Sequence, residues 1–274
     1  MRLGWKRVGA GSVASLMTLG GLLAVTGNQG VASCQREVAI MPEATVSESA
    51  GTLVFEVVSG GCAAAGAVTY TVSGGTSTPD VDFVLPAGQL LWTAGDATPR
   101  MIIAGVVNDP ATEASIEDFT VTLTSQSQYI HVAQGIGRGR ILDDDRPEWD
   151  WAIDGQICFP IYVVPVPGKP GKVVYSCDDL RPDPYSPVAI NKPLQQATTL
   201  HWETLNGTAI AGVDFVGVTD QVQTVAAGAT KVLLPVKLLP HPPGTPTRWF
   251  EVRIFGISQG VVVDDIALVV ISGS

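Results

Sequence analysis

A ten-residue sequence occurs twice in this chain, and this repeat constrains the fold more than any other feature. The first copy is Gly75–Val84 (GTSTPDVDFV), and Gly207–Val216 (GTAIAGVDFV) follows 132 residues later. The similarity continues further, because Phe119 aligns with Phe250 after a deletion of one residue. Self-similarity at a fixed spacing is typical of a duplicated structural unit. The 274 residues therefore predict two related domains, each large enough to bury a core.

Alternation of apolar and polar residues predicts that both domains are built from β-strands. In FTVTLT (119–124) the odd positions are apolar and the even positions are threonine, and FEVRI (250–254) is its counterpart. This pattern is typical of strands with one buried face. Similar segments recur with Gly, Pro or Asp between them, which predicts an all-β fold of two antiparallel sandwiches with Greek-key connections. Further predicted strands are 53–58, 68–72, 89–92, 101–107, 139–142, 232–239 and 266–271.

Residues 1–33 have the pattern of an export signal. Arg2, Lys6 and Arg7 precede a mostly apolar run at 12–26, and the small residues 31–33 (VAS) offer a cleavage site. The run is short and rich in glycine for a membrane span, so we predict cleavage rather than an uncleaved anchor. The mature chain is then extracytoplasmic, which means secreted, periplasmic or at the cell surface.

The charge of the predicted mature chain excludes some partners. The segment 1–33 contains three basic and no acidic residues, so its removal changes the formal net charge from −10 to −13. An acidic surface disfavours nucleic acid and anionic lipid as partners and is compatible with cations. We therefore predict no nucleic acid partner and no membrane span in the mature chain. A protein or a glycan at the cell surface is the expected partner.

Four cysteines remain after the predicted signal: Cys34, Cys62, Cys158 and Cys177. An even number of cysteines in an exported protein indicates disulfides, and four cysteines allow three pairings. We favour Cys34–Cys62 and Cys158–Cys177, one pair within each repeat. The second pair flanks VPVPGKPG (164–171), a strong turn signal that predicts a Pro-rich hairpin near 155–178.

The sequence around Cys34 also allows an alternative. VASC (31–34) resembles the site at which bacterial lipoproteins are cleaved and lipidated on cysteine. However, NQG (28–30) separates the apolar run from this cysteine, and lipidation would leave Cys62 without an obvious mate. A lipid-anchored envelope protein is therefore the alternative rather than the main prediction.

Six short motifs follow one another in the first half of the chain. In this order and spacing they resemble the Calx-beta domain family, which occurs in sodium–calcium exchangers, in an integrin and in many bacterial surface proteins. The resemblance covers domain one, 34–146, and most of domain two, 147–274, from Thr199 onward. It implies an immunoglobulin-like sandwich of about seven strands in each domain. The motifs are SESAG (47–51), GT…VDF (75–83), GQLLW (88–92), VVND (106–109), EDFTVTL (117–123) and ILDDD (141–145).

The resemblance also implies a calcium site built from acids at one end of domain one. Glu48 matches a family glutamate at the start of a strand, and Asp109 matches an acid of a connecting loop. Asp143, Asp144 and Asp145 match the acidic run that ends the domain. Five carboxylates close together would repel one another without a cation, and Ca²⁺ prefers six to eight oxygen ligands.

Departures from the family pattern weaken this expected site. Gly74 and Pro110 stand where calcium-binding members carry acids, so we predict one weak calcium ion at the junction of the two domains. The alternative is that the aspartates only solubilise a turn. In domain two none of the matching positions carries a carboxylate, so no such site is expected there; these positions are Asn206, His241, Ser272, Gly273 and Ser274.

No motif in the sequence indicates catalysis. GISQG (256–260) matches the Gly-x-Ser-x-Gly pattern of serine hydrolases, but that pattern needs a following helix and a later histidine, and VVV (261–263) predicts a strand instead. We therefore predict a non-enzymatic structural or adhesive module. A glycan-binding protein or hydrolase accessory protein that uses the domain-two insertion, with Trp149 and Trp151 stacking on the ligand, is the second alternative.

Overall fold

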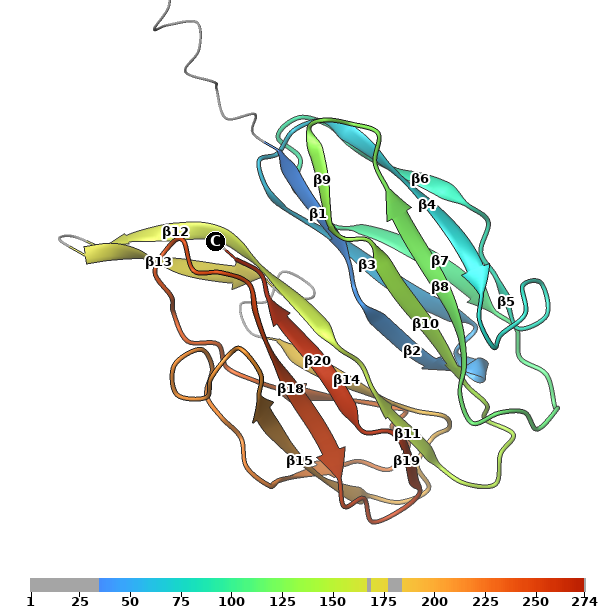
Figure 1. Ribbon diagram of the computed structural model, residues 1–274. Coiled ribbons are helices and arrows are strands. Elements are labelled where there is room, and N and C mark those ends of the chain that lie inside the picture. The colour runs from blue at the N-terminus through green and yellow to red at the C-terminus, as the bar shows by residue number, and fades with distance from the viewer. Residues whose placement is uncertain (1–34, 167–168, 177–183, 274) are drawn as a thin grey trace, which may run out of the picture. The chain divides into compact units, whose positions relative to one another are not determined.

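The computed structural model describes residues 35–166, 169–176 and 184–273, and their regular structure is almost entirely β-strand (Figure 1). The first half contains ten strands and one short 3-10 helix, η1 (Glu48–Ala50). The strands are β1 (Arg36–Ile40), β2 (Glu43–Ser47), β3 (Thr52–Gly61), β4 (Gly66–Gly74), β5 (Phe83–Val84), β6 (Gly88–Trp92), β7 (Arg100–Val106), β8 (Glu117–Thr124), β9 (Ile130–Gln134) and β10 (Ile136–Leu142).

The second half contains ten further strands in a similar sequence. Within the described residues, no helix is long and apolar enough to cross a membrane. The strands are β11 (Asp150–Ile153), β12 (Gln156–Val166), β13 (Lys169–Ser176), β14 (Tyr185–Ile190), β15 (Thr198–Asn206), β16 (Gln221–Val225), β17 (Lys231–Pro235), β18 (Arg248–Phe255), β19 (Val261–Asp264) and β20 (Ile266–Ile271).

The two halves have corresponding strand orders, except that the described part of the second half has no strand equivalent to β5 and has one additional strand, β13. The sheets of the first half have the orders β5-β7-β3-β1-β9 and β2-β10-β8-β4-β6, and those of the second half β17-β14-β11-β19 and β13-β12-β20-β18-β15-β16. The pairs β1–β9 and β11–β19 are both parallel, and each contains one register shift. The chain therefore forms two tandem immunoglobulin-like β-sandwiches, as the repeat and the resemblance predicted. We name them the first sandwich (β1–β10) and the second sandwich (β11–β20).

The second sandwich differs from the first at two strands. Strand β13 pairs antiparallel with β12 and extends its sheet, and residues 167–168 between the two strands lie outside the described residues. The predicted strand 232–239 was too long, because β17 ends at Pro235. Beyond this proline the chain leaves β14, and Leu238 forms a bridge with Phe215 instead.

The repeated sequence forms the same aromatic core contact in each sandwich. Phe83 stacks on Phe119 with ring centroids 4.0 Å apart, and Phe215 stacks on Phe250 at 4.0 Å. All four side chains are buried, together with the other inward-facing residues of β8 and β18. The predicted alternation of these two strands is confirmed. Burying large aromatic side chains supplies much of the driving force for such cores.

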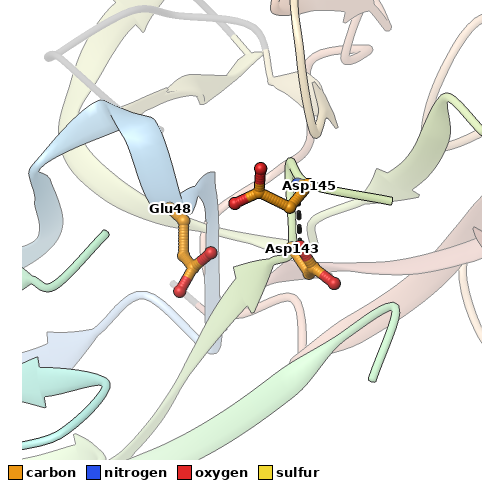
Figure 2. Close-up of side chains that lie close together, drawn as sticks. All are labelled: Glu48, Asp143 and Asp145. Atoms are coloured by element: carbon orange, nitrogen blue, oxygen red, sulfur yellow. Dashed lines mark hydrogen bonds between the residues drawn. The ribbon is translucent and has the colours of Figure 1, made fainter. Parts of the chain in front are cut away.

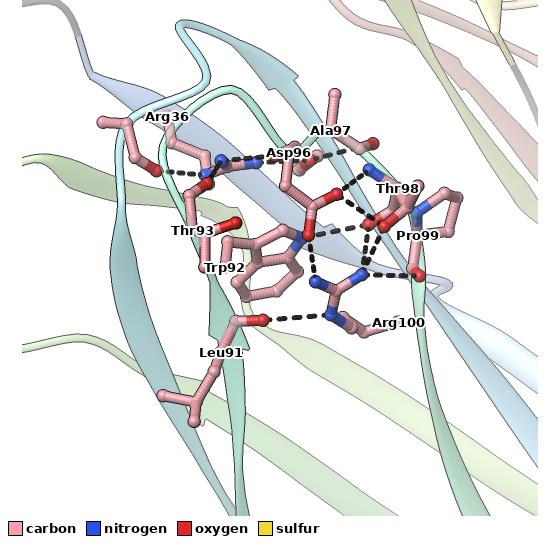
Figure 3. A network of polar contacts seen from close by, with 11 residues as sticks. Arg36, Leu91, Trp92, Thr93, Asp96, Ala97, Thr98, Pro99 and Arg100 are labelled. Carbon is pink, nitrogen blue, oxygen red and sulfur yellow. Dashed lines mark hydrogen bonds and ion pairs between the residues drawn. The ribbon is translucent and has the colours of Figure 1, made fainter.

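A buried arginine at one end of the first sandwich holds the loop between β6 and β7 in place (Figure 3). The guanidinium of Arg36 is fully buried and donates to the Ala64 carbonyl at 2.7 Å and to the Asp96 carbonyl at 2.5 Å. It lies 5.4 Å from the ring centroid of Trp92, and Arg100 lies 5.3 Å from the same ring. These contacts satisfy a charge that would be costly to bury alone.

A second buried arginine joins strands of both sandwiches, which fall within one compact unit, Gln35–Ser274. Arg140 on β10 donates to the carboxylate of Asp154 at 2.7 Å and to the Ile153 carbonyl at 2.8 Å, and it forms an ion pair with Asp264. Its Nε atom donates to the hydroxyl of Thr45 at 2.9 Å. The side chains of Arg140 and Asp154 are only 3% and 5% exposed, so this ion pair is almost completely removed from water, whereas the side chain of Asp264 is 30% exposed.

Several predictions fall partly outside the described residues. The predicted signal 1–33 lies outside them, as do Cys34 and Cys177. Cys62 and Cys158 are each disulfide-bonded, and none of the described cysteines is free. The pairings Cys34–Cys62 and Cys158–Cys177 stay predictions.

Candidate metal centre

Glu48 is a buried acid at the turn between β2 and β3. It begins helix η1, which ends at Ala50. The next residue, Gly51, caps the helix with φ +70°, a conformation that glycine adopts without strain. The residue is only 3% exposed, and within the described residues its Oε2 atom has no hydrogen-bond partner. A buried carboxylate oxygen without a partner is costly, so this position requires a physical explanation.

Asp143 and Asp145 lie opposite Glu48, in the loop that follows β10 (Figure 2). The carboxylate of Asp143 is buried and accepts hydrogen bonds from the backbone N–H of Glu113 at 2.6 Å and of Asp145 at 2.8 Å. Each carboxylate oxygen has more than one acceptor direction, so these bonds fix the loop and leave oxygen lone pairs for a ligand.

The three acids form a cluster with metal-ligand spacing. One carboxylate oxygen from each of Glu48, Asp143 and Asp145 lies within 4.8 Å of the others. The structure therefore brings together three of the five predicted ligands. Asp109 and Asp144 do not belong to this group, although their charges reach Glu48. Asp109 accepts a hydrogen bond from the backbone N–H of Ala111 at 2.7 Å.

A second acidic cluster lies near the first and was missed in the sequence. Carboxylate oxygens of Asp82, Glu113 and Glu117 lie within 4.8 Å of one another, and charges of both clusters act on Glu48 and Glu117. The weakening of the site by Gly74 and Pro110 stays a prediction, and this second cluster places three further acids near it. Asp82 also accepts a hydrogen bond from the backbone N–H of Thr78 at 2.5 Å, which closes a local turn. We name the two clusters together the first pole.

One signal in the sequence could have indicated Glu117. It has the same strand parity as the buried Phe119, so its side chain points to the inner side of β8. A carboxylate on the apolar face of a strand is unusual and indicates a specific partner. Glu113 had no such signal, because it lies in the loop between β7 and β8, where no periodicity applies.

Burial and mutual repulsion raise the pKa values of acids in the first pole. The pKa of Glu48 is raised to about 8, first by burial and then by the charges of Glu113, Asp143, Asp109 and Asp144. The pKa of Glu117 is raised to about 7 by burial, by neighbouring carboxylates and by a hydrogen bond with Asp82. Burial and like charges raise the pKa of Glu113 as well. Each of these shifts shows that negative charge at this pole is unfavourable without a cation.

The calcium-free protein is expected to lose stability as pH rises from about 4.5 to about 8. Glu48 and Glu117 hold protons in the folded state at pH values where they are ionised in the unfolded state, because their folded pKa values are about 8 and about 7. The unfolded state then binds fewer protons, so the free energy of unfolding decreases with pH. Thermal unfolding in chelator at pH 5, 6, 7 and 8 measures this. In the variant Glu117→Gln the unfolding temperature should fall less steeply with pH below pH 7. A dependence on pH equal to that of the wild type would contradict the raised pKa of Glu117.

The donor set of the first pole fits calcium better than softer metals. All six clustered side chains are carboxylates, and no histidine or cysteine belongs to either cluster. Calcium takes six to eight oxygen ligands from carboxylates, carbonyls and water, and magnesium requires a stricter octahedral geometry. Zinc and copper sites usually include nitrogen or sulfur ligands, which neither cluster provides.

The serine motif of the second sandwich forms a turn. Ser258 lies between β18 and β19, and its hydroxyl accepts a hydrogen bond from the backbone N–H of Thr199 at 3.0 Å. Strand β19 follows it, as predicted, in place of the helix that a nucleophilic serine requires.

The tryptophans near the seam do not form a ligand-stacking pair. Trp151 is fully buried in the core of the second sandwich, and its indole N–H donates to the Gln259 carbonyl at 3.0 Å. Trp149 donates to the Pro193 carbonyl at 3.2 Å.

The Calx-beta domain model matches residues 38–145 and 187–267, which is more than half of the chain. The chain therefore belongs to the Calx-beta domain family. The second matched region begins at 187, before the predicted Thr199. No curated protein matches the chain.

Several solved structures are similar to the chain. CBD12 from CALX1.2 is 16% identical, covering 85% of this chain and 99% of its own, with a TM-score of 0.37. The apo-form Calx CBD1 domain is 26% identical, covering 40% of this chain and 99% of its own, with a TM-score of 0.38. A two-domain protein of unknown function from Bacteroides fragilis is 8% identical, covering 79% and 93%, with a TM-score of 0.28. The family assignment rests on the domain model, because these scores are low.

Proposed function

We propose that the protein is an exported, non-enzymatic module that binds calcium at the first pole and acts as a structural or adhesive element at the cell surface. In this proposal residues 1–33 are the export signal, and the domains are 34–146 and 147–274. Glu48, Asp143 and Asp145 are the central calcium ligands. Asp82, Glu113 and Glu117 complete the acidic shell, and Asp109 and Asp144 contribute charge.

The unpartnered oxygen of Glu48 carries this proposal. Its carboxyl group is buried within ligand distance of two aspartates, and its Oε2 atom has no hydrogen-bond partner among the described residues, so ionising it is unfavourable. A divalent cation would compensate this charge and would replace repulsion among the acids by attraction. Modules of this kind outside the cell bind calcium with dissociation constants of about 10⁻⁴–10⁻³ M, which suits one weak site.

Contacts at the seam favour a stiffening role for the ion. The side-chain amide of Asn191 donates to the backbone carbonyl of Asp143 at 2.8 Å, and its oxygen accepts from the backbone N–H of Asp150 at 2.9 Å. Arg146 donates to the carboxylate of Asp150 at 2.9 Å and to the Glu113 carbonyl at 3.1 Å. An ion that orders the loops of Asp143 and Glu113 would therefore also order the start of the second sandwich.

Calcium is expected to raise the unfolding temperature of the wild-type chain. Five millimolar calcium at a dissociation constant of about 10⁻⁴ M stabilises by about 2 kcal/mol, which corresponds to about 4–8 °C for a chain of this size. Differential scanning calorimetry with calcium or with chelator measures the shift. Magnesium at the same concentration should give a smaller shift. Identical transitions in calcium and chelator would contradict the proposal.

One alternative from the sequence, the lipid-anchored protein, has a separate test. Lipidation of Cys34 would appear as added mass on the mature N-terminal peptide. Glycan stacking on Trp149 and Trp151 is disfavoured, since Trp151 is fully buried.

A further inference from the structure

The second sandwich has a buried ion pair at the end that corresponds to the first pole. Asp214 lies in the second copy of the repeated sequence, and its carboxylate oxygen is 2.8 Å from Nε of Arg248. The side chains of Asp214 and Arg248 are 8% and 7% exposed. His241 is also buried, with its Nε2 atom 3.5 Å from the carboxylate of Asp214. We name Asp214, His241 and Arg248 the second pole.

The repeat shows which residues of the two poles correspond. Asp82 and Asp214 occupy the same position of the repeated sequence, and each accepts a hydrogen bond from a backbone N–H four residues earlier. Glu117 precedes Phe119 by two residues, as Arg248 precedes Phe250. Both therefore lie at the start of an equivalent strand, β8 or β18, on its inward-facing side.

The same turn aspartate therefore faces opposite charges in the two sandwiches. Asp82 contacts the carboxyl group of Glu117, whose pKa is raised, whereas Asp214 contacts a guanidinium. Arginine stays protonated at any relevant pH, so its positive charge is permanent. The pKa of His241 is lowered by burial and by the charge of Arg248, which favours a neutral imidazole beside the pair.

From this comparison we infer that Arg248 takes, in the second sandwich, the place that a bound cation takes at the first pole. The second pole is then neutralised by a side chain of the protein and needs no metal. The fold of the second sandwich is independent of calcium, whereas the first responds to it. The residue at the first inward-facing position of β8 or β18 decides whether the sandwich needs a cation: Glu117 is acidic and Arg248 is basic.

The first test is carried out in chelator and does not depend on calcium binding anywhere. Arg248→Met in the full chain leaves Asp214 buried without its cation and should lower the unfolding temperature by about 5–10 °C. Arg248→Lys keeps the charge and should lose less than half of this. The double variant Asp214→Asn with Arg248→Met should lose clearly less than the sum of the single variants. Strict additivity would overturn the inference.

The second test asks whether removal of the guanidinium creates a cation site. The background protein carries Asp145→Asn, which weakens the first pole. The test variant adds Arg248→Glu and His241→Asp to this background. These two changes place acids at the positions that correspond to Glu117 and Asp109. This variant should be less stable than its background in chelator and should gain at least about 3 °C in 10 mM calcium. The background with Arg248→Met is the matched control and should not respond. No calcium response of the variant beyond this control would overturn the inference.

The two tests separate this inference from the proposed function. The comparison of Arg248 with a bound cation rests on the proposed function, so a wild-type chain without a calcium response would overturn both. Coupling in the chelator cycle would then show only that Asp214 and Arg248 form a stabilising ion pair. If calcium stabilises the wild-type chain but the chelator cycle is additive, the proposed function stands and the role of Arg248 fails.

Discussion

Replacing Glu48 by glutamine is expected to stabilise the calcium-free protein at pH 8 and to abolish its stabilisation by calcium. The buried carboxylate of Glu48 has a pKa raised to about 8, so ionising it costs free energy in the folded state. Glutamine has nearly the same shape and no charge, so it removes this cost, which is on the order of 1–3 kcal/mol after allowance for relaxation. It also removes a ligand, so calcium should no longer raise the unfolding temperature.

The opposite signs of the two effects make the experiment specific. A merely structural acid would lose stability on substitution both with calcium and with chelator. Glu37→Gln is a suitable control, because Glu37 lies on β1 with a side chain 42% exposed and outside both acidic clusters. Glu37→Gln should change neither the unfolding temperature in chelator nor the increase of that temperature in calcium. If Glu48→Gln destabilised the calcium-free protein at pH 8, the assignment of Glu48 would be wrong.

Replacing Arg140 by methionine is expected to lower the free energy of unfolding by about 3–5 kcal/mol. This substitution removes the cation beside the buried carboxylate of Asp154, which keeps only its hydrogen bonds from Thr45, and it removes the Arg140 donor from the Ile153 carbonyl. Removing one partner of a buried ion pair costs this much because the remaining charge stays desolvated. Denaturant unfolding, with the slope compared between variants, measures the loss.

Arg138→Met on the same strand provides the matched control. Arg138 donates to the carboxylate of Asp118 at 2.6 Å, but its side chain is 52% exposed. Exposed ion pairs contribute about 0–1 kcal/mol, so this variant should lose far less than Arg140→Met. Equal losses in the two variants would show that the network around Arg140 does not stabilise the fold as described.

The fold could be predicted from the sequence because its signals are local. Alternation in FTVTLT and FEVRI fixed which residues of β8 and β18 face the core, and the repeat predicted that Phe83 and Phe215 have equivalent places. One exception was 232–239, where the alternation continued past the end of β17 at Pro235. Local patterns do not show where a strand exchanges one partner for another.

The candidate site could be predicted only in part, because it is assembled from loops that are distant in sequence. Glu48, Asp143 and Asp145 were found through their places in family motifs. Asp82 could not be found in this way, because an aspartate in a turn usually bonds only to its own backbone, whereas here its carboxylate serves both that bond and a neighbouring cluster. The contacts of Arg140 had no sequence signal at all, since a charged residue on a strand usually faces solvent.

A crystal grown in calcium tests the central claim most directly, through the anomalous signal of the bound ion. The account predicts one or more peaks within about 2.3–2.6 Å of carboxylate oxygens of Glu48, Asp143 and Asp145, and no peak between Asp214 and Arg248. Carboxylates of the first pole that remain without an ion at saturating calcium, or an ion bound beside Arg248 instead, would contradict it.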